Sequence, residues 1–482
     1  MYCAGTPRSM SDDETGLAFA GETLPDRLPD PLFVTPGHGM LEFEYRQLRD
    51  AGRDLSGVAD EFEATLALDP DDPELEARVR DLLDRGPELP IRDDYPYDEP
   101  TDLAAIRAAS PDAPRAVDAI ADVDRAAAAD AIHGGWLGAC AGCLLGKPVQ
   151  GWPRSRILGF ARDSGQYPID SYLRSDVDPA VAERYNVHEN LEPIDAFADE
   201  IDGMPIDDDV DYIAVGLETL ETYGFGFDTA DVGNHWLESL PMFNTYTAER
   251  VAYRNLAERV LPPASATRRN PYREMIGAAI RADPWGYAAL GDPTYAAELA
   301  HRDATLSHTK NGVYGEMWAA AAIAAAPFVD DRDELLAVGL AEVPADCRLA
   351  EEVTLVREWY DQGVPAGEVA DRIHERWDET SMYDWVHTLS NAMVIAFGVL
   401  YGEGDLGESL RLAVETGFDT DSHAATIGSI VGTAHGAAAL PDDWTAPLND
   451  TVETSLPGRG RESISGLAEA TTAVWADSPR RS

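Results

Sequence analysis

Apolar residues recur at helical intervals along most of the chain, with no convincing strand-like alternation and no repeat of fixed period. In the stretch 206–220 they stand three and four positions apart, so they would share one face of a helix. These residues are Val210, Ile213, Ala214, Leu217 and Leu220. The pattern therefore predicts an all-α fold. Further helical runs are predicted at 229–240, 247–260, 271–282, 294–306, 311–326, 331–341, 348–361, 366–376, 385–401 and 405–415.

Glycine recurs every fourth residue in two apolar segments that lie far apart in the sequence. The first segment has Gly134, Gly138, Gly142 and Gly146, and the second has Gly428, Gly432 and Gly436. Each glycine inside a helix costs roughly 1 kcal/mol relative to alanine, so such a series requires a structural reason. Two helices whose glycine stripes face each other can pack backbone to backbone. We expect this pairing, which would bring residues 147–150 close to Asp419.

The first 125 residues differ in character from the rest. Residues 1–37 combine Pro, Asp and Gly with little periodicity, whereas 41–48 and 73–83 have helical spacing with acidic residues early and Arg late. Pro-Asp and Asp-Asp turns follow up to residue 125. We predict an accessory arm over 1–125, partly irregular and partly helical, and a catalytic domain over 126–482. Met10 precedes an acidic run typical of a protein start, so translation from either Met1 or Met10 is left open.

The charge is extreme, with 88 acidic and 37 basic residues and a formal net charge of −51. A salt-rich cytoplasm would make this tolerable, because screening shortens the reach of charge repulsion to about 3 Å at 1 M salt. We interpret most of the acidic residues as a solvated surface in a cytoplasmic protein of a high-salt organism. No basic patch favours nucleic acid or anionic membranes, and no apolar run of about 20 residues favours a membrane span. The oligomeric state stays open.

Two groups of oxygen donors each stand directly before an apolar helical segment. One is Asp207-Asp-Asp209 and the other is Asp419-Thr-Asp-Ser422. A solvated helix cap is the alternative for the first group, since the helix dipole favours acidic residues there. However, two like charges about 4 Å apart cost about 4 kcal/mol at an effective dielectric of 20, so a partly buried group requires a cation. We predict a site for two Mg²⁺ ions, with Mn²⁺ as a substitute.

Other metals fit this pattern less well. Cys140 and Cys143 have the spacing of half a zinc site, but no second Cys or His pair stands at ligand spacing. We interpret both cysteines as small core residues. An EF-hand is excluded because the glycine and the bidentate Glu of its loop are missing.

Three motifs carry a resemblance to a known family. Gly417-Phe-Asp-Thr-Asp-Ser422 is similar to a Gly-Gly-Asp-Thr-Asp-Thr motif, and Asp207-Asp-Asp-Val210 is similar to a Thr-Asp-Asp-Thr motif. Gly142-Cys-Leu-Leu-Gly146 resembles a Gly-Asp-Ala-Leu-Gly motif. The family is the ADP-ribosylglycohydrolases, which include the dinitrogenase-reductase-activating glycohydrolase. The likeness covers roughly 126–450 and implies an orthogonal multi-helix bundle with an N-terminal helical extension.

The resemblance also implies roles for individual residues. Metal ions would be held by Asp207, Asp208, Asp209, Asp419, Asp421 and Ser422. Asp209 or Asp419 would accept the proton of the water that attacks the ribose anomeric carbon. Backbone N–H groups near Gly277 and Gly312, with His308, would hold a phosphate or a base. The substrate-binding residues would be Gln150, Gly277, His308, Gly312 and His387.

Three positions depart from the family pattern. Cys143 replaces an Asp, Gln150 replaces a Glu, and Lys147 stands where a small residue is usual. The expected function is Mg²⁺-dependent hydrolysis of an ADP-ribosyl or related ribosyl bond, in a small molecule or an ADP-ribosylated macromolecule. One alternative is a hydrolase of a small N-ribosyl compound such as a nucleoside. Another is a non-catalytic binding or structural protein that keeps the fold.

Overall fold

The computed structural model describes residues 32–111, 123–187 and 196–481. Helices dominate it, and the all-α prediction is confirmed. Across these ranges the only named strands are β1 (Val452–Glu453) and β2 (Arg461–Glu462), which pair antiparallel with Val452 opposite Glu462. The first 31 residues, with both predicted start positions, lie outside the described ranges.

The α-helices follow one another along the chain. In the first half of the chain they are α1 (His38–Asp50), α2 (Ala59–Leu66), α3 (Leu75–Arg85), α4 (Leu103–Ala109), α5 (Arg125–Gly146), α6 (Arg154–Ser164), α7 (Pro179–Tyr185), α8 (Asp208–Tyr223), α9 (Thr229–Ser239) and α10 (Thr247–Ala257). In the second half they are α11 (Ala264–Thr267), α12 (Asp283–Ala288), α13 (Pro293–Ala304), α14 (Asn311–Ala325), α15 (Arg332–Leu340), α16 (Arg348–Asp361), α17 (Ala366–Arg376), α18 (Met382–Trp385), α19 (Thr388–Tyr401), α20 (Leu406–Thr416), α21 (Thr420–His435), α22 (Asp442–Thr445) and α23 (Ile464–Ala476).

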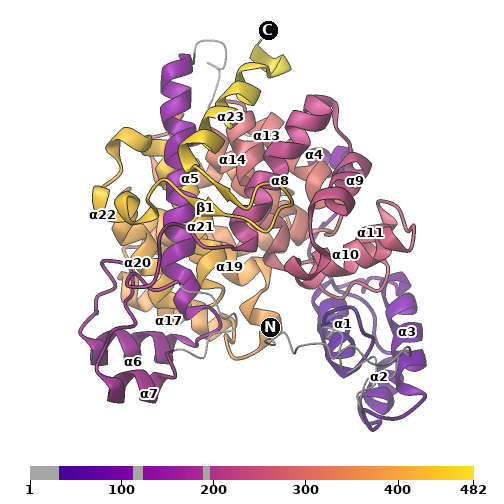
Figure 1. The fold of residues 1–482 in the computed structure, drawn as a ribbon. Coiled ribbons are helices and arrows are strands. Elements are labelled where there is room, and N and C mark those ends of the chain that lie inside the picture. The colour runs from indigo at the N-terminus through magenta and orange to yellow at the C-terminus, as the bar shows by residue number, and fades with distance from the viewer. Residues whose placement is uncertain (1–31, 112–122, 188–195, 482) are drawn as a thin grey trace, which may run out of the picture.

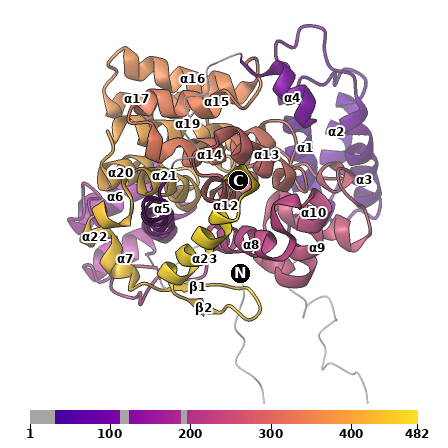
Figure 2. The same ribbon diagram turned by 90° about the horizontal axis from the view of Figure 1, so that it is seen from above.

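The two glycine-striped helices, α5 and α21, lie against each other at the centre of the molecule (Figures 1 and 2). A Cβ atom added at Gly138 would overlap the backbone of Gly428, and one added at Gly142 would overlap the backbone of Ala424. The backbones therefore approach more closely than any side chain would allow. The predicted pairing is confirmed, and it places the end of α5 beside the start of α21.

One predicted helix, over 271–282, is wrong. The chain instead forms turns and then a 3₁₀ helix, Ile276–Arg281. The cause lies at Met275, which is extended and forms an isolated β-bridge with His387. Ile276 also donates its backbone N–H to the Val386 carbonyl at 2.9 Å. These long-range bonds outweigh the local helical preference.

Helices α1, α2 and α3 of the N-terminal arm form a small helical lobe at the side of the molecule, whereas α4 packs on the larger part, where Ile106 joins the main core (Figure 1). Apolar residues of α1 and α3 pack with Ala248, Tyr272 and Met275 of the larger part. Polar contacts join the same surfaces: Gln47 Nε2 donates to Glu274 Oε1 at 2.5 Å. The arm thus bears directly on the segment 272–275. The division of the chain at residue 125 stays a prediction.

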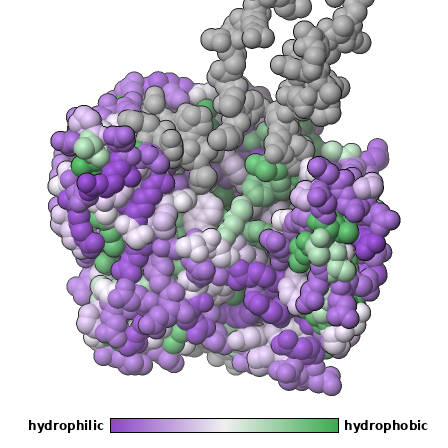
Figure 3. Space-filling model, turned by 90° about the horizontal axis from the view of Figure 1, so that it is seen from below, coloured by the Kyte–Doolittle hydropathy of each residue, from purple (hydrophilic) through white to green (hydrophobic). Residues whose placement is uncertain are grey.

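The surface is mostly hydrophilic on the face seen from below, with small scattered apolar areas (Figure 3). This agrees with a surface interpretation of most of the 88 acidic residues. Within the described ranges, no helix is both long and apolar enough to cross a membrane.

Candidate metal centre

Three helix ends meet at one buried point. They are the C-terminal end of α5, which continues into the short 3₁₀ helix Lys147–Val149, and the N-terminal ends of α8 and α21. Thr420 Oγ1 donates a hydrogen bond to the Gly146 carbonyl at 2.8 Å, which fixes α5 to α21. The Gln150 side chain contacts the carboxyl of Asp419. The expectation that residues 147–150 lie beside Asp419 is therefore confirmed.

The α8 side of the centre is organised by Asp207, the N-cap of that helix. Its Oδ1 accepts a hydrogen bond from the backbone N–H of Asp209 at 2.9 Å, and its Oδ2 forms an ion pair with Lys147 Nζ. Burial alone would raise the pKa of Asp207, but the ammonium outweighs it and keeps that pKa below its usual value. Asp207 is therefore ionised and paired.

The α21 side brings its carboxyl groups to the same point. Ser422 Oγ lies 3.1 Å from Asp419 Oδ2 and 3.4 Å from Asp209 Oδ2, so one hydroxyl links the two helices. The Asp421 carboxyl lies beside that of Asp419. Asp208 is half-buried at the margin. The two acidic groups, far apart in sequence, thus form one composite cluster, as the sequence predicts.

Several carboxylate oxygens in this cluster accept no hydrogen bond from any described donor. They are Oδ1 of Asp209 and both oxygens of Asp421, and all three are buried. Burial and the neighbouring carboxylates raise the pKa of both residues well above the usual value. Buried carboxylates without donors are costly, and a hard divalent cation is the partner that their oxygens fit. The donor set is compatible with Mg²⁺.

Cys143, which departs from the family motif and which the sequence predicts to be a core residue, lies at the cluster. A ligand atom from each of Cys143, Asp207 and Asp209 lies within 4.8 Å of the others. Burial and the adjacent carboxylates raise the pKa of this thiol well above its usual value, so it stays neutral. A neutral thiol suits packing better than ligation of a hard cation.

Three of the predicted substrate residues gather around a buried carboxylate, Glu249. Gly277 faces that carboxylate directly, His308 Nε2 lies 3.7 Å from Glu249 Oε1, and Gly312 packs on the His308 ring. Burial lowers the pKa of His308 well below its usual value, and the neighbouring Arg281 adds to that effect. A neutral imidazole beside an acid disfavours an anion at this point. Their contact with substrate stays a prediction.

His387 is linked to the cluster through Asn391, a residue that the sequence did not single out. The side-chain amide of Asn391 donates to the His387 carbonyl at 3.0 Å, and its Oδ1 accepts from the backbone N–H of Asp419 at 3.3 Å. Asn391 thus holds the start of α21 against the start of α19. The four-residue spacing of His387 and Asn391 on one helix was the available signal.

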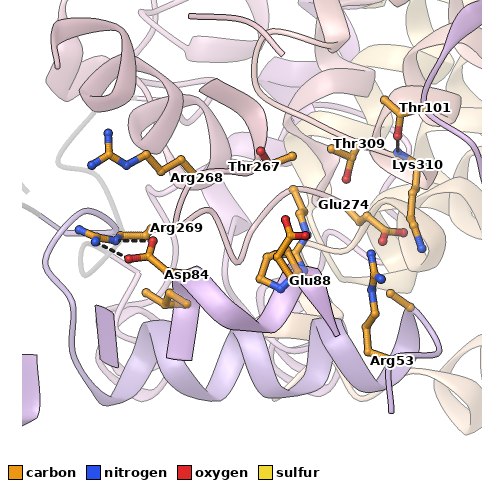
Figure 4. Close-up of a pocket in the computed structure, with 14 residues that line it drawn as sticks. Arg53, Asp84, Glu88, Thr101, Thr267, Arg268, Arg269, Glu274, Thr309 and Lys310 are labelled. Atoms are coloured by element: carbon orange, nitrogen blue, oxygen red, sulfur yellow. Dashed lines mark hydrogen bonds and ion pairs between the residues drawn. The ribbon is translucent and has the colours of Figure 1, made fainter. Parts of the chain in front are cut away.

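An open cavity of about 370 Å³ lies elsewhere, between the arm and the larger part (Figure 4). Arg53 and Lys310 line it, and Arg269 pairs there with Asp84 at its edge. None of the carboxylates of the metal centre lines this cavity. It includes Glu274, which the arm residue Gln47 contacts, so it borders the segment that leads to Gly277.

Comparison with known proteins identifies the family of the chain. The family profile of ADP-ribosylglycohydrolase matches residues 124–480, which is most of the chain. The chain belongs to the ADP-ribosylglycohydrolase family. The expected all-α fold, in which two helices begin with acidic residues, is therefore the fold of a member of this family. The family match begins at residue 124, beyond the described helices of the arm.

Individual relatives are more distant. An uncharacterized protein of Archaeoglobus fulgidus is 30% identical over 188 residues, which is 38% of this chain and 56% of that protein. The chain thus spans about half the length of this curated relative. A solved structure described as an ADP-ribosylglycohydrolase-related protein complex is 18% identical, with a TM-score of 0.44. The match covers 72% of this chain and 98% of that one.

Proposed function

We propose that the protein is a Mg²⁺-dependent hydrolase of an ADP-ribosyl or related ribosyl glycosidic bond, with Mn²⁺ as a substitute ion. The observation that carries the proposal is the set of buried, donor-free oxygens on Asp209 and Asp421, contributed by two different helix starts. Ribosyl compounds of low molecular weight and ADP-ribosylated macromolecules are the substrate classes. The acidic surface supports work in a salt-rich cytoplasm.

The residues of the cluster have different proposed roles. Asp209, Asp419, Asp421 and Ser422 would hold the ion, and Asn391 fixes the backbone at Asp419. When bound, Mg²⁺ supplies Lewis acidity to the hydroxyl groups and water that it contacts. The bond from the ribose anomeric carbon to the leaving group breaks as the bond to the water oxygen forms, through an oxocarbenium-like transition state. Asp209 or Asp419 accepts the water proton, and the leaving group departs with the bonding pair.

The proposed substrate-binding residues lie at the acidic cluster and around Glu249. Gln150 contacts Asp419, so its side-chain amide would be within reach of a ribose hydroxyl bound near the ion. His387 is linked to the cluster indirectly, through its hydrogen bond with Asn391. Gly277, His308 and Gly312 lie around Glu249, and they suit an uncharged base better than a phosphate.

A hydrolase of a small N-ribosyl compound is the second candidate. The observation that favours it is the altered lining at Cys143, Lys147 and Gln150, all three of which lie at the acidic cluster. These changes alter the charge next to the predicted ribose position. A loss of all catalysis is the third possibility, and the metal-binding experiments below distinguish it.

The test is incubation of the pure protein in concentrated KCl with Mg²⁺, against an ADP-ribosylated protein and a panel of nucleosides. Release of free ADP-ribose from the protein supports the first candidate, and release of a free base from nucleosides alone supports the second. The matched control is Asp421→Asn, which removes one charge and keeps the shape of the side chain. Equal turnover by wild type and Asp421→Asn would contradict the proposal.

A further inference from the structure

Lys147 is buried inside the acidic cluster. It is one of only two lysines in the chain, and its side chain is 4% exposed. A buried ammonium is costly by several kcal/mol unless a carboxylate compensates it, and Asp207, with a fully buried side chain, does so. The close packing of Gly146 on Thr420 fixes the backbone immediately before Lys147. The ammonium therefore has a fixed position between the ends of the three helices.

The lysine changes what Asp207 can bind. One Asp207 oxygen accepts from the backbone N–H of Asp209, and the other is paired with Lys147. Both oxygens are thus used by protein groups. Asp421 differs, since neither of its oxygens accepts a hydrogen bond from a described donor. The carboxylate oxygens that accept no hydrogen bond therefore lie on the side of the cluster where Asp209 meets the start of α21.

We propose that the Lys147 ammonium takes the place of one of the two expected metal ions, so that the centre holds a single divalent ion. That ion would be bound by Asp209, Asp419, Asp421 and Ser422, with Asp207 excluded. The proposal rests on the metal dependence proposed above, and it concerns the number of ions and their ligands. Lys147 acts here as a positioning residue, because it holds Asp207 and, through it, the backbone of Asp209.

One ammonium does not remove the need for a metal. Asp209, Asp419 and Asp421 are buried beside one another, and the oxygens without donors belong to two of these three residues. A single positive charge that is paired with Asp207 compensates them only in part, because the pKa of Asp421 stays well above its usual value although Lys147 lowers it. A divalent ion supplies both the charge and the several oxygen contacts that these side chains offer.

The experiment counts bound ions. The protein in concentrated KCl is dialysed against Mn²⁺ until saturated, and bound Mn²⁺ is measured by elemental analysis and by its electron paramagnetic resonance signal. We expect one ion per wild-type chain and two in Lys147→Met, which removes the ammonium and keeps most of the length of the unbranched side chain. The matched control is Lys310→Met, the other lysine, which lines the distant cavity and should keep one ion.

Two further variants test the ligand set. Asp421→Asn should weaken binding by more than about 100-fold, beyond the usual effect of residues that only support a ligand. If Lys147→Met does not fold, the double variant Lys147→Met with Asp207→Asn removes the pair as a neutral change and should bind one ion. Thermal unfolding monitored by circular dichroism establishes the fold of each variant.

The outcomes separate the two proposals. Two ions on the wild type, a single ion on folded Lys147→Met, or loss of the ion in the folded double variant would overturn the role of Lys147 and leave the metal-dependent function intact. No Mn²⁺ on the wild type would instead contradict the proposed function itself.

Discussion

Thr420 Oγ1 donates a hydrogen bond to the Gly146 carbonyl at 2.8 Å, at the point where the helix that leads to Lys147 meets the helix that follows Asp419. This contact is possible only because glycine lines the facing surfaces of α5 and α21. The packing of the central helices therefore determines the position of the acidic cluster, and a change in one should affect the other.

The first prediction concerns this packing. Gly138→Ala places a Cβ against the backbone of Gly428, where no flexible side chain can move aside. We expect a loss of unfolding free energy of about 1–3 kcal/mol or more, as for other overpacked cores. Chemical denaturation in concentrated salt measures it. The control is Gly367→Ala, at a helical glycine of α17 with nothing within 4 Å, which should stabilise by up to about 1 kcal/mol. Equal effects at the two positions would contradict the account.

The second prediction concerns metal removal. The donor-free oxygens of Asp421 lose their compensating charge when a chelator removes the ion, so the melting temperature should fall in wild type. Asp421→Asn removes one buried charge, so its metal-free form should melt higher than metal-free wild type. It should also gain less from added Mg²⁺. Thermal unfolding with and without chelator gives both values. A wild-type melting temperature that does not respond to Mg²⁺ would disagree with this account.

The third prediction concerns pH. Burial raises the pKa of Glu249 from 4.5 to about 7, although Arg281 lies 2.8 Å away, because Arg281 is shared with Asp303. Between pH 4.5 and 7 the folded protein therefore binds this proton more tightly than the unfolded chain does. The contribution of Glu249 to stability is present below pH 4.5 and is lost as the pH rises to 7, by at most about 1.4 kcal/mol per pH unit.

Glu249→Gln tests this dependence. The difference in unfolding free energy between wild type and this variant should change in favour of the variant as the pH rises from 4.5 to 7. Denaturant titrations at several pH values measure the difference. A difference that stays constant with pH would show that Glu249 does not titrate in this range.

The fourth prediction concerns the departure at Gln150, whose side chain contacts Asp419. The family motif that this segment resembles has Glu at this position, so Gln150→Glu adds a carboxylate next to the proposed ion site. We expect turnover with Mg²⁺ to rise by about tenfold or more, toward the range of a general base. Without metal, the added negative charge should lower the melting temperature. Unchanged turnover together with unchanged metal affinity would remove Gln150 from the site.

The sequence predicts the centre of the fold well because its signals are local and periodic. The glycines at every fourth position need only one explanation, which is the close approach of α5 and α21. The acidic groups stand at helix starts, where the boundary between polar and apolar residues is sharp. Most predicted helices from residue 229 onward agree with the structure for the same reason.

The remaining features depend on long-range contacts that no local pattern encodes. The helix predicted over 271–282 does not form, because the backbones of Met275 and Ile276 form a β-bridge and a hydrogen bond with the segment before α19. Lys147 was noticed as a departure, but its pairing with Asp207 required the structure. Asn391 was likewise hidden, since its role depends on the backbone of a residue 28 positions away.

Diffraction from crystals grown with Mn²⁺, measured at the manganese absorption edge, tests the central claim most directly. The account predicts an anomalous peak enclosed by the carboxylates of Asp209, Asp419 and Asp421, with the Lys147 ammonium still on Asp207. A saturated crystal without a peak at this cluster, or with its peak elsewhere in the molecule, would contradict it.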